Sequence, residues 1–202
     1  MRIIVIGDGK VGRTIVEHIC QEGHEVVVID TDPSSIEEVI ENYDVMGIVG
    51  NGASYEILKS ANASKADIVI AATSSDETNI LACLIAKKIG AKSTIARVRN
   101  IEYSNQTHIF EKDLGITMTI NPENEAAREI LKIIHFPQAL RIDSFANGKV
   151  DLIEVFISED SPLIGKSLLE MYQQYQIKVL VCAVQRNDKV IIPSGNFIFE
   201  AK

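Results

Sequence analysis

The chain has 202 residues, of which 46% are hydrophobic and 24% are charged, so it can bury a core and is not disordered throughout. Its 20 basic and 28 acidic side chains give a net charge of −8, which argues against broad nucleic-acid binding. Cys20, Cys83 and Cys182 lack any C-x-x-C spacing, so we expect reduced, packed thiols and no metal centre. No apolar run approaches the ~20 residues of a membrane helix. These features predict a soluble, cytoplasmic protein that binds no nucleic acid.

Through the first two thirds of the chain, short β-branched runs alternate with helix-length amphipathic stretches. Most of the runs are apolar at nearly every position, which is typical of parallel strands covered on both faces. Asp32–Pro33 and Asn121–Pro122 each place a capping residue before a proline, which marks a helix start. The expected strands are Arg2–Ile6, Glu25–Ile29, Val45–Val49, Asp67–Ala71, Ser93–Val98 and Ile116–Ile120. We therefore predict a doubly wound α/β domain with a parallel, Rossmann-type sheet over residues 1–135.

The pattern changes after Phe136–Pro137, which ends the helix that begins near Asn121. The remaining signals are a strand pair around Asn147–Gly148, a helix from Gly165 to Gln174, and a second strand pair, Lys178–Gln185 with Lys189–Ile192. They predict a small α+β domain over residues 140–202. Because the chain stops within an apolar strand pattern, we expect the natural protein to continue and this domain to be truncated.

The most informative segment is the glycine-rich turn Gly7–Gly12, with the sequence G-D-G-K-V-G, between an apolar strand and a helix. In that setting Gly7 permits the tight turn, Gly9 lets a pyrophosphate approach the backbone, and Gly12 lets the helix pack closely. The amides at the helix N-terminus are then expected to receive phosphate groups.

An acidic residue ends the second expected strand, one βαβ unit after the glycine turn. Asp30 stands at the spacing at which a carboxylate accepts hydrogen bonds from both ribose hydroxyls of a nucleotide. Asp32 adds a second negative charge, which favours NAD over NADP because it repels a 2′-phosphate. The simpler interpretation is a set of turn glycines with a capping aspartate.

Three further segments fall at strand ends, where ligand-binding loops lie in such sheets. Gly50–Ala53 contains Asn51 and Gly52, and its glycines leave room for an adenine under this interpretation. Thr73–Asn79 brings hydroxyl groups to a helix start, where ordinary capping is an equal alternative. We expect one of Arg97 and Arg99 to face the nucleotide and hold a phosphate by a bidentate hydrogen bond, although a surface ion pair fits the spacing equally well.

The chain lacks a recognisable set of catalytic residues. It shows no Ser/His/Asp arrangement, metal cluster or P-loop, and its four histidines all lie within the first 135 residues. A nucleotide site without an evident acid–base partner favours sensing over catalysis. Two enzymes remain as alternatives: an NAD-dependent oxidoreductase, and an S-adenosylmethionine methyltransferase, against which Gly12 and the Thr73–Asn79 heptad count.

Several of these segments together resemble the regulatory subunits of Trk potassium-uptake systems, the TrkA or RCK/KTN family. The resemblance is carried by Met1–Gly12, Val28–Asp32, Gly50–Ser54, the distinctive heptad Thr73–Asn79, and Ile95–Arg99. It continues through Ser161–Lys166 and Val179–Val184 into the small domain called RCK-C or TrkA-C, so that it covers nearly the entire chain. Full-length members carry two such halves in tandem, and this sequence resembles one half.

The resemblance implies a peripheral subunit on the inner face of the cell membrane that binds NAD(H), or ADP or ATP in the same site, and gates a potassium transporter. Nucleotide binding is expected to shift the shape of an oligomeric ring. Carried over residue by residue, the nucleotide contacts are Gly7, Asp8, Gly9, Lys10, Val11, Asp30, Asn51, Gly52, Thr73, Ser74 and Arg97, with Asp32, Asp76 and Glu77 as further candidates.

The helix Asn121–His135 carries more apolar residues than one face needs to cover a sheet: Ala126, Ala127, Ile130, Leu131, Ile133 and Ile134. We predict that it crosses to a second copy and makes at least a homodimer. The alternative is a helix that covers the sheet edge and packs on the second domain.

Overall fold

The structure is a computed structural model that describes residues 1–146, 148–176 and 179–201. The chain divides into two compact units, Met1–Arg128 and Glu129–Lys202, and the division falls within one helix, α6 (Pro122–His135). The domain boundary expected from the sequence, between residues 135 and 140, remains a prediction.

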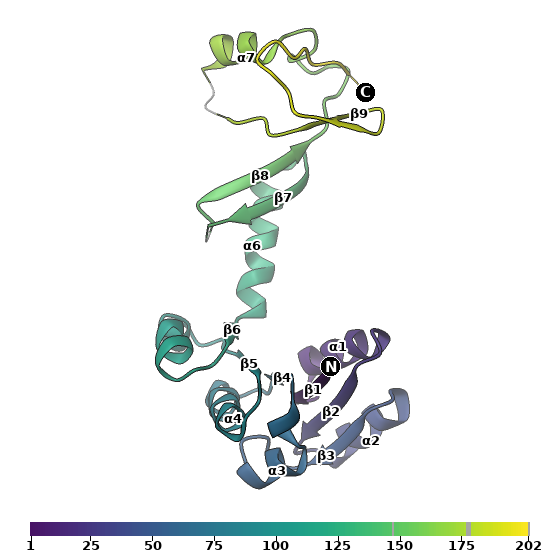
Figure 1. Cartoon of the computed structure of the whole chain (residues 1–202), viewed down its shortest axis with the longest axis vertical. Coiled ribbons are helices and arrows are strands. Elements are labelled where there is room, and N and C mark those ends of the chain that lie inside the picture. The colour runs from purple at the N-terminus through teal and green to yellow at the C-terminus, as the bar shows by residue number, and fades with distance from the viewer. Residues whose placement is uncertain (147, 177–178, 202) are drawn as a thin grey trace. The chain divides into compact units, whose positions relative to one another are not determined.

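The first unit is built on a six-stranded parallel sheet with the order β3-β2-β1-β4-β5-β6 (Figure 1). Its strands are β1 (Arg2–Ile6), β2 (Glu25–Asp30), β3 (Met46–Val49), β4 (Ile68–Ala71), β5 (Ser93–Arg97) and β6 (Met118–Ile120). The predicted parallel Rossmann-type sheet is therefore confirmed, and so are all six strands. The chain reverses its direction of travel across the sheet between β3 and β4, which places the topological switch point beside β1.

Helices cover both faces of this sheet. Side chains of α1 (Lys10–Gln21) and α2 (Pro33–Asn42) pack with one set of strand residues, and α3 (Tyr55–Ser60) and α4 (Asp76–Ile89) pack with the alternate set. The two sets alternate along β1: Ile3 and Val5 face α1 and α2, whereas Ile4 and Ile6 face the other layer. The unit also contains α5 (Ile101–Ser104), a 3₁₀ turn at Ala63–Lys65 and a π-helical turn at Ile109–Asp113.

The expected caps are present. Asp32 accepts a hydrogen bond from the Ser34 amide at 3.0 Å at the start of α2, and Asn121 accepts one from the Asn124 amide at 3.0 Å at the start of α6. Ser75 caps α4 through the Thr78 amide at 3.1 Å. These caps fix the helix starts that follow β2, β4 and β6.

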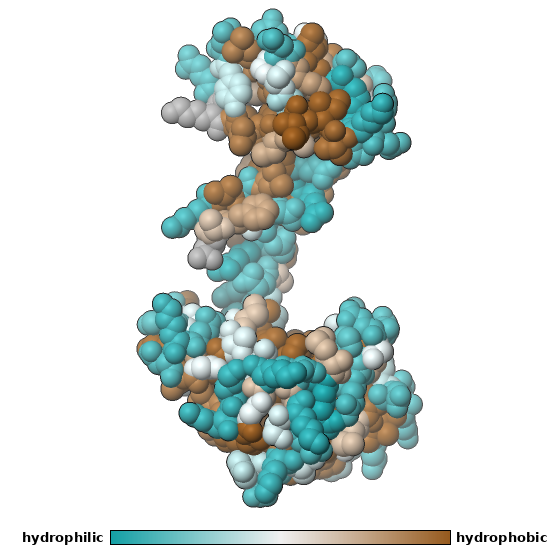
Figure 2. Space-filling view, in the orientation of Figure 1, coloured by the Kyte–Doolittle hydropathy of each residue, from teal (hydrophilic) through white to brown (hydrophobic). Residues whose placement is uncertain are grey.

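The second unit contains two antiparallel strand pairs and one helix after its part of α6. The elements are β7 (Ala139–Phe145), β8 (Val150–Val155), α7 (Leu168–Tyr175), β9 (Val184–Arg186) and β10 (Lys189–Ile191). A small core of Leu168, Met171 and Phe199 joins α7 to the end of the described chain. Many apolar side chains in this unit are exposed, as the brown surfaces in Figure 2 show, and Leu180 and Ile192 are 83% and 85% exposed.

Three expectations for the second unit need correction or qualification. The helix begins at Leu168 and not at Gly165, because Ser167 forms a capping box with Glu170 and stops the helix there. The strand expected from residue 178 begins only at Val184, and Lys178 itself lies outside the described residues, as does Asn147 of the first turn. Cys182 is exposed and not packed, whereas Cys83 is buried and Cys20 half-buried, and all three thiols are free.

Candidate nucleotide-binding site

The glycine turn lies at the carboxyl end of β1, and two of its glycines are required by close contacts. Gly7 has a φ of +96°, and a Cβ placed there would lie 2.8 Å from the amide nitrogen of Thr73 in the loop after β4. A Cβ on Gly12 would lie 1.8 Å from the carbonyl oxygen of Gly7, so that only glycine lets α1 start this close to the turn. The predicted roles of both residues, a tight turn and close helix packing, are thus accounted for by protein contacts.

Gly9 differs from these two glycines because the space beside it is open. A Cβ on Gly9 would meet no described atom within 4 Å, and its φ of −70° is accessible to any residue. Gly9 is the N-cap of α1 and gives no side-chain cap to the helix, whereas Asp32 and Ser75 cap α2 and α4. The first helical residues, Lys10 and Val11, therefore stand at a helix N-terminus without a side-chain acceptor, which is the arrangement that binds phosphate in dinucleotide-binding folds.

Asp30 ends β2 directly beside the glycine turn. Its Oδ2 accepts a hydrogen bond from the Asp8 amide at 2.6 Å, and its Oδ1 accepts one from the Asp32 amide at 2.9 Å. Each carboxylate oxygen retains a second lone pair, so the group can still accept from a ribose hydroxyl. The Asp32 carboxylate is engaged differently: hydrogen bonds from the hydroxyl and amide of Ser34 hold its pKa below the ordinary value. Asp32 is thus an exposed helix cap that adds negative charge near Asp30.

The side chain of Asp8 does not face solvent. It is only 3% exposed, and its Oδ2 accepts from Arg13 Nη2 at 2.7 Å and from Ser35 Oγ at 3.2 Å. Its Oδ1 is buried and has no hydrogen-bond partner among the described residues. Hydrogen bonds to Asp8, and then to Glu38, raise the pKa of Arg13 above its ordinary value. The Asp8 side chain is therefore occupied within the protein, and a ligand contact from its backbone remains a prediction.

Arg13 was not predicted as a site residue; it joins the turn to α2 through Asp8, Ser35 and Glu38. Opposite charges at Asp8 and Arg13, five residues apart across a helix start, were the available signal. Their meaning depended on how deeply the turn is buried, which spacing alone does not reveal.

The loop after β3 differs from the expectation. A Cβ on Gly50 would lie 2.6 Å from Ile57 Cδ1, and one on Gly52 would lie 2.0 Å from Ile6 Cγ2. Protein side chains and not an adenine therefore occupy the space beside these glycines. Asn51 is exposed, and its Oδ1 accepts from the Ala53 amide at 2.9 Å, which shapes the loop. A nucleotide contact from Asn51 or Gly52 remains a prediction.

The loop after β4 is held by Asn79, which is completely buried on α4. Its Oδ1 accepts from the Thr73 amide at 2.9 Å and from Thr73 Oγ1 at 2.7 Å, and its Nδ2 donates to the Arg97 carbonyl at 2.9 Å. One amide side chain thus fixes the ends of β4 and β5 against each other. Thr73 and Arg97, both predicted from the sequence, are brought together through Asn79.

Asp76 and Arg99 connect the same loop to the segment that follows β5. Asp76 is 7% exposed, and its Oδ2 accepts from the amides of Arg99 and Asn100 at 2.8 and 2.7 Å. The Arg99 guanidinium donates to the carbonyl of Ser74. Ser74 is exposed, so its side chain is free to meet a ligand, but its carbonyl is already engaged.

Arg97 ends β5, and its side chain turns to α6. Its Nη2 makes an ion pair with Glu123 in the first turn of that helix. The Arg97 side chain is 14% exposed, and its Nε is buried without a partner in the described part of the chain. The helix amide at Glu123, and then Arg97, hold the pKa of Glu123 below its ordinary value. The Arg97 guanidinium is therefore paired with a carboxylate in this structure, and a phosphate contact from Arg97 remains a prediction.

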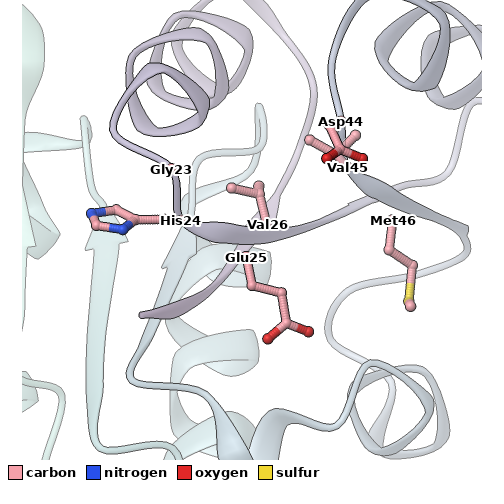
Figure 3. Close-up of a pocket in the computed structure, with 7 residues that line it drawn as sticks. All are labelled: Gly23, His24, Glu25, Val26, Asp44, Val45 and Met46. Atoms are coloured by element: carbon pink, nitrogen blue, oxygen red, sulfur yellow. The ribbon is translucent and has the colours of Figure 1, made fainter.

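The hollow shown in Figure 3 lies at the amino ends of the strands, opposite the ends that carry the glycine turn. It is lined by residues that precede or begin β2 and β3: Gly23, His24, Glu25, Val26, Asp44, Val45 and Met46. The glycine turn and Asp30 instead follow the carboxyl ends of β1 and β2. Ligands of doubly wound sheets bind at the carboxyl ends, so this hollow is not the candidate site.

Fold and site together define a Rossmann-type dinucleotide-binding domain: a glycine turn, an uncapped helix N-terminus and an acidic residue meet at the switch point of a parallel sheet. Residues 3–122 match the TrkA-N domain family, and residues 152–202 match the TrkA-C domain family. The chain belongs to the TrkA family.

Curated relatives match the whole of this chain. It is 36% identical over 201 residues to a Trk system potassium uptake protein TrkA homolog of Archaeoglobus fulgidus, covering 100% of this chain and 45% of that protein. It is 33% identical over 204 residues to Trk system potassium uptake protein TrkA of Halomonas elongata, covering 100% of this chain and 45% of that protein. The chain thus spans about half the length of these relatives.

Solved structures share the fold. The TrkA-N domain of inner membrane protein ybaL from Escherichia coli has a TM-score of 0.59 at 22% identity, over 66% of this chain and 96% of that chain. The GsuK channel bound to NAD has a TM-score of 0.60 at 16% identity, over 98% of this chain and 35% of that chain. Along the described residues, no helix combines the length and apolar character needed to cross a membrane.

Proposed function

We propose that this chain is a nucleotide-binding regulatory module of a potassium-uptake system, and that it binds NAD(H), or ADP or ATP, at the glycine turn. The observation that carries the proposal is the uncapped start of α1. Gly9 leaves open space beside the helix N-terminus, while Asp30 stands one strand away at the height of the turn. A diphosphate on the amides and a ribose on Asp30 use both features at once.

The partner proposed for this module is a membrane potassium transporter, at whose cytoplasmic face it acts as a peripheral subunit. Relatives that match the whole chain are named as potassium uptake proteins, which supports this assignment. Nucleotide binding is proposed to shift the shape of an oligomeric assembly. A ligand shifts such an equilibrium only through different affinities for the two shapes, and moving it from 1:99 to 99:1 needs ~5.5 kcal/mol.

Self-association is proposed to use α6. This helix exposes a series of large apolar side chains, Ile130, Leu131, Ile133 and Ile134, each more than half exposed at 58%, 51%, 67% and 65%. Exposure of such a series to water is unfavourable, and burial against a second copy would remove this apolar surface from water. Light scattering at micromolar concentration is expected to give a dimer or a larger species, and a monomer at all concentrations would refute this part.

The proposed nucleotide function is tested by calorimetric titration of the full chain with NADH, NAD, ADP and ATP. Saturable binding of at least one of them, lost when Asp30 is replaced by alanine, is expected. Absence of binding to all four would refute the proposal. Mixing the NADH complex with keto acids, and the NAD complex with hydroxy acids, separates regulation from hydride transfer, because sustained turnover would favour the oxidoreductase alternative.

A further inference from the structure

The orientation of the Asp30 carboxylate depends on the backbone of the glycine turn. Its Oδ2 accepts from the Asp8 amide at 2.6 Å, and its Oδ1 accepts from the Asp32 amide at 2.9 Å. Because each oxygen is held by its own donor, the carboxylate cannot rotate without losing these bonds, and its remaining lone pairs keep fixed directions. Whatever holds the Asp8 amide in place therefore also sets the directions in which Asp30 can meet ribose hydroxyls.

The Asp8 amide is held in turn by Arg13, through the side chain of Asp8. That side chain is completely buried, and its Oδ2 accepts from Arg13 Nη2 at 2.7 Å and from Ser35 Oγ at 3.2 Å. Its Oδ1 has no partner among the described residues. A buried carboxylate left with one hydroxyl as its donor is costly, so the guanidinium is what keeps the Asp8 side chain inside the protein.

We propose that Arg13 is a positioning residue for ribose recognition: it keeps Asp8 buried, and the Asp8 amide thereby keeps Asp30 oriented towards the 2′-hydroxyl. The proposal rests on the proposed nucleotide function. Without the guanidinium, the uncompensated Asp8 carboxylate moves towards water and carries its amide away from Asp30. Asp30 itself stays at the end of β2, because its carbonyl accepts from the Gly50 amide at 2.7 Å, but its carboxylate loses one of the two donors that orient it. The expected defect is a loss of selectivity for the ribose hydroxyl.

The experiment compares each nucleotide that the wild-type chain binds, among NADH, ADP and ATP, with its 2′-deoxyadenosine form, by calorimetry on the full chain. The measured quantity is the ratio of the two dissociation constants. A loss of stability lowers the folded fraction for both forms alike and cancels in this ratio, whereas a misdirected Asp30 carboxylate does not. Arg13→Met removes the guanidinium, and Arg13→Gln is a second charge-removing variant in case the first does not fold. Arg128→Met is the control, because it also removes an arginine paired with a carboxylate, but at an exposed position on α6.

The wild type is expected to bind the 2′-deoxy form at least about tenfold less tightly, as when a hydrogen bond to a charged group is lost. In Arg13→Met this ratio should fall to about threefold or less, and adding Asp8→Asn should restore it, because the neutral amide tolerates burial. Arg128→Met should keep the wild-type ratio. An unchanged ratio in Arg13→Met, a ratio that Asp8→Asn does not restore, an equal fall in Arg128→Met, or a wild type that does not distinguish the two forms would overturn the proposal while the nucleotide function stands. If the wild-type chain binds no nucleotide, the proposed function itself fails.

Discussion

Asn79 and Thr73 are joined by three hydrogen bonds, through which the side-chain amide of one residue pairs with the backbone and hydroxyl of the other. Asn79 Oδ1 accepts from the Thr73 amide and from Oγ1, and Asn79 Nδ2 donates to the Thr73 carbonyl at 3.2 Å. The same Nδ2 also donates to the carbonyl of Arg97. The loop after β4 is therefore preorganised by α4 before any ligand arrives.

Replacing Asn79 by alanine is expected to lower the free energy of unfolding by ~2–4 kcal/mol, because buried backbone groups of Thr73 and Arg97 lose their partner. Urea denaturation followed by circular dichroism measures the change. Asn42→Ala is the control, since Asn42 is exposed and its side chain bonds only to the Glu38 carbonyl. Equal effects of the two variants would refute this role for Asn79.

Substitution of Gly12 is expected to impair folding, whereas substitution of Gly9 is expected to impair nucleotide binding alone. Gly12→Ala places a methyl group 1.8 Å from the Gly7 carbonyl and should destabilise the protein by more than ~3 kcal/mol. Gly9→Ala meets no described atom, so its thermal midpoint should equal that of the wild type. Its methyl group stands where the phosphates should approach, so NADH affinity should fall at least about tenfold. Unchanged affinity in a folded Gly9→Ala variant would contradict the assigned phosphate position.

Arg13 is expected to contribute strongly to the free energy of unfolding, because it pairs with the buried Asp8 carboxylate. Arg13→Met leaves the Asp8 carboxylate buried with only Ser35 as a side-chain partner, at an expected cost of ~2–3 kcal/mol. Adding Asp8→Asn should restore ~1–2 kcal/mol, because the neutral amide needs no counterion. Arg128→Met serves as the control, since its pair with Glu125 is exposed and worth at most ~0.5 kcal/mol. Additive losses in the double variant would show that the two residues are not coupled.

The three thiols should differ in reactivity when the folded chain is treated with iodoacetamide at pH 8. Burial raises the pKa of Cys83 to about 12, and burial with the charge of Asp44 raises that of Cys20. Because the thiolate is the reactive form, a raised pKa means slower alkylation. Cys182 is exposed and should react first, Cys20 more slowly, and Cys83 only after unfolding, as followed by mass spectrometry. Early labelling of Cys83 would contradict the packing of α4 on the sheet.

The parallel sheet could be predicted from sequence because its signals are local. Apolar runs such as Ile3–Ile6, caps such as Asp32, and the glycine turn each specify their own structure. β9 was harder to delimit, since an apolar run does not show where pairing starts, and among the described residues of this run only Val184–Arg186 pairs with β10. The turn between these strands did follow from Asn187–Asp188, both of which have positive φ.

The partners of the site residues could not be predicted, because they come from distant parts of the chain. Arg97 and Glu123 lie 26 residues apart, and nothing in either segment reveals that the arginine is already paired. Gly50 and Gly52 were interpreted as space for a ligand, but the side chains of Ile57 and Ile6 fill that space. The sequence therefore predicted that the site lies at the carboxyl ends of the strands. It did not predict which side chains there are already paired within the protein, because this depends on tertiary contacts.

The most direct measurement is a crystal structure of the full chain grown with NADH. We predict that the dinucleotide diphosphate lies within hydrogen-bond distance of the amides at the start of α1, that its adenosine ribose contacts Asp30, and that the Arg97–Glu123 ion pair is intact. Dinucleotide density elsewhere on the chain, or a glycine turn that stays without ligand at saturating NADH, would contradict it.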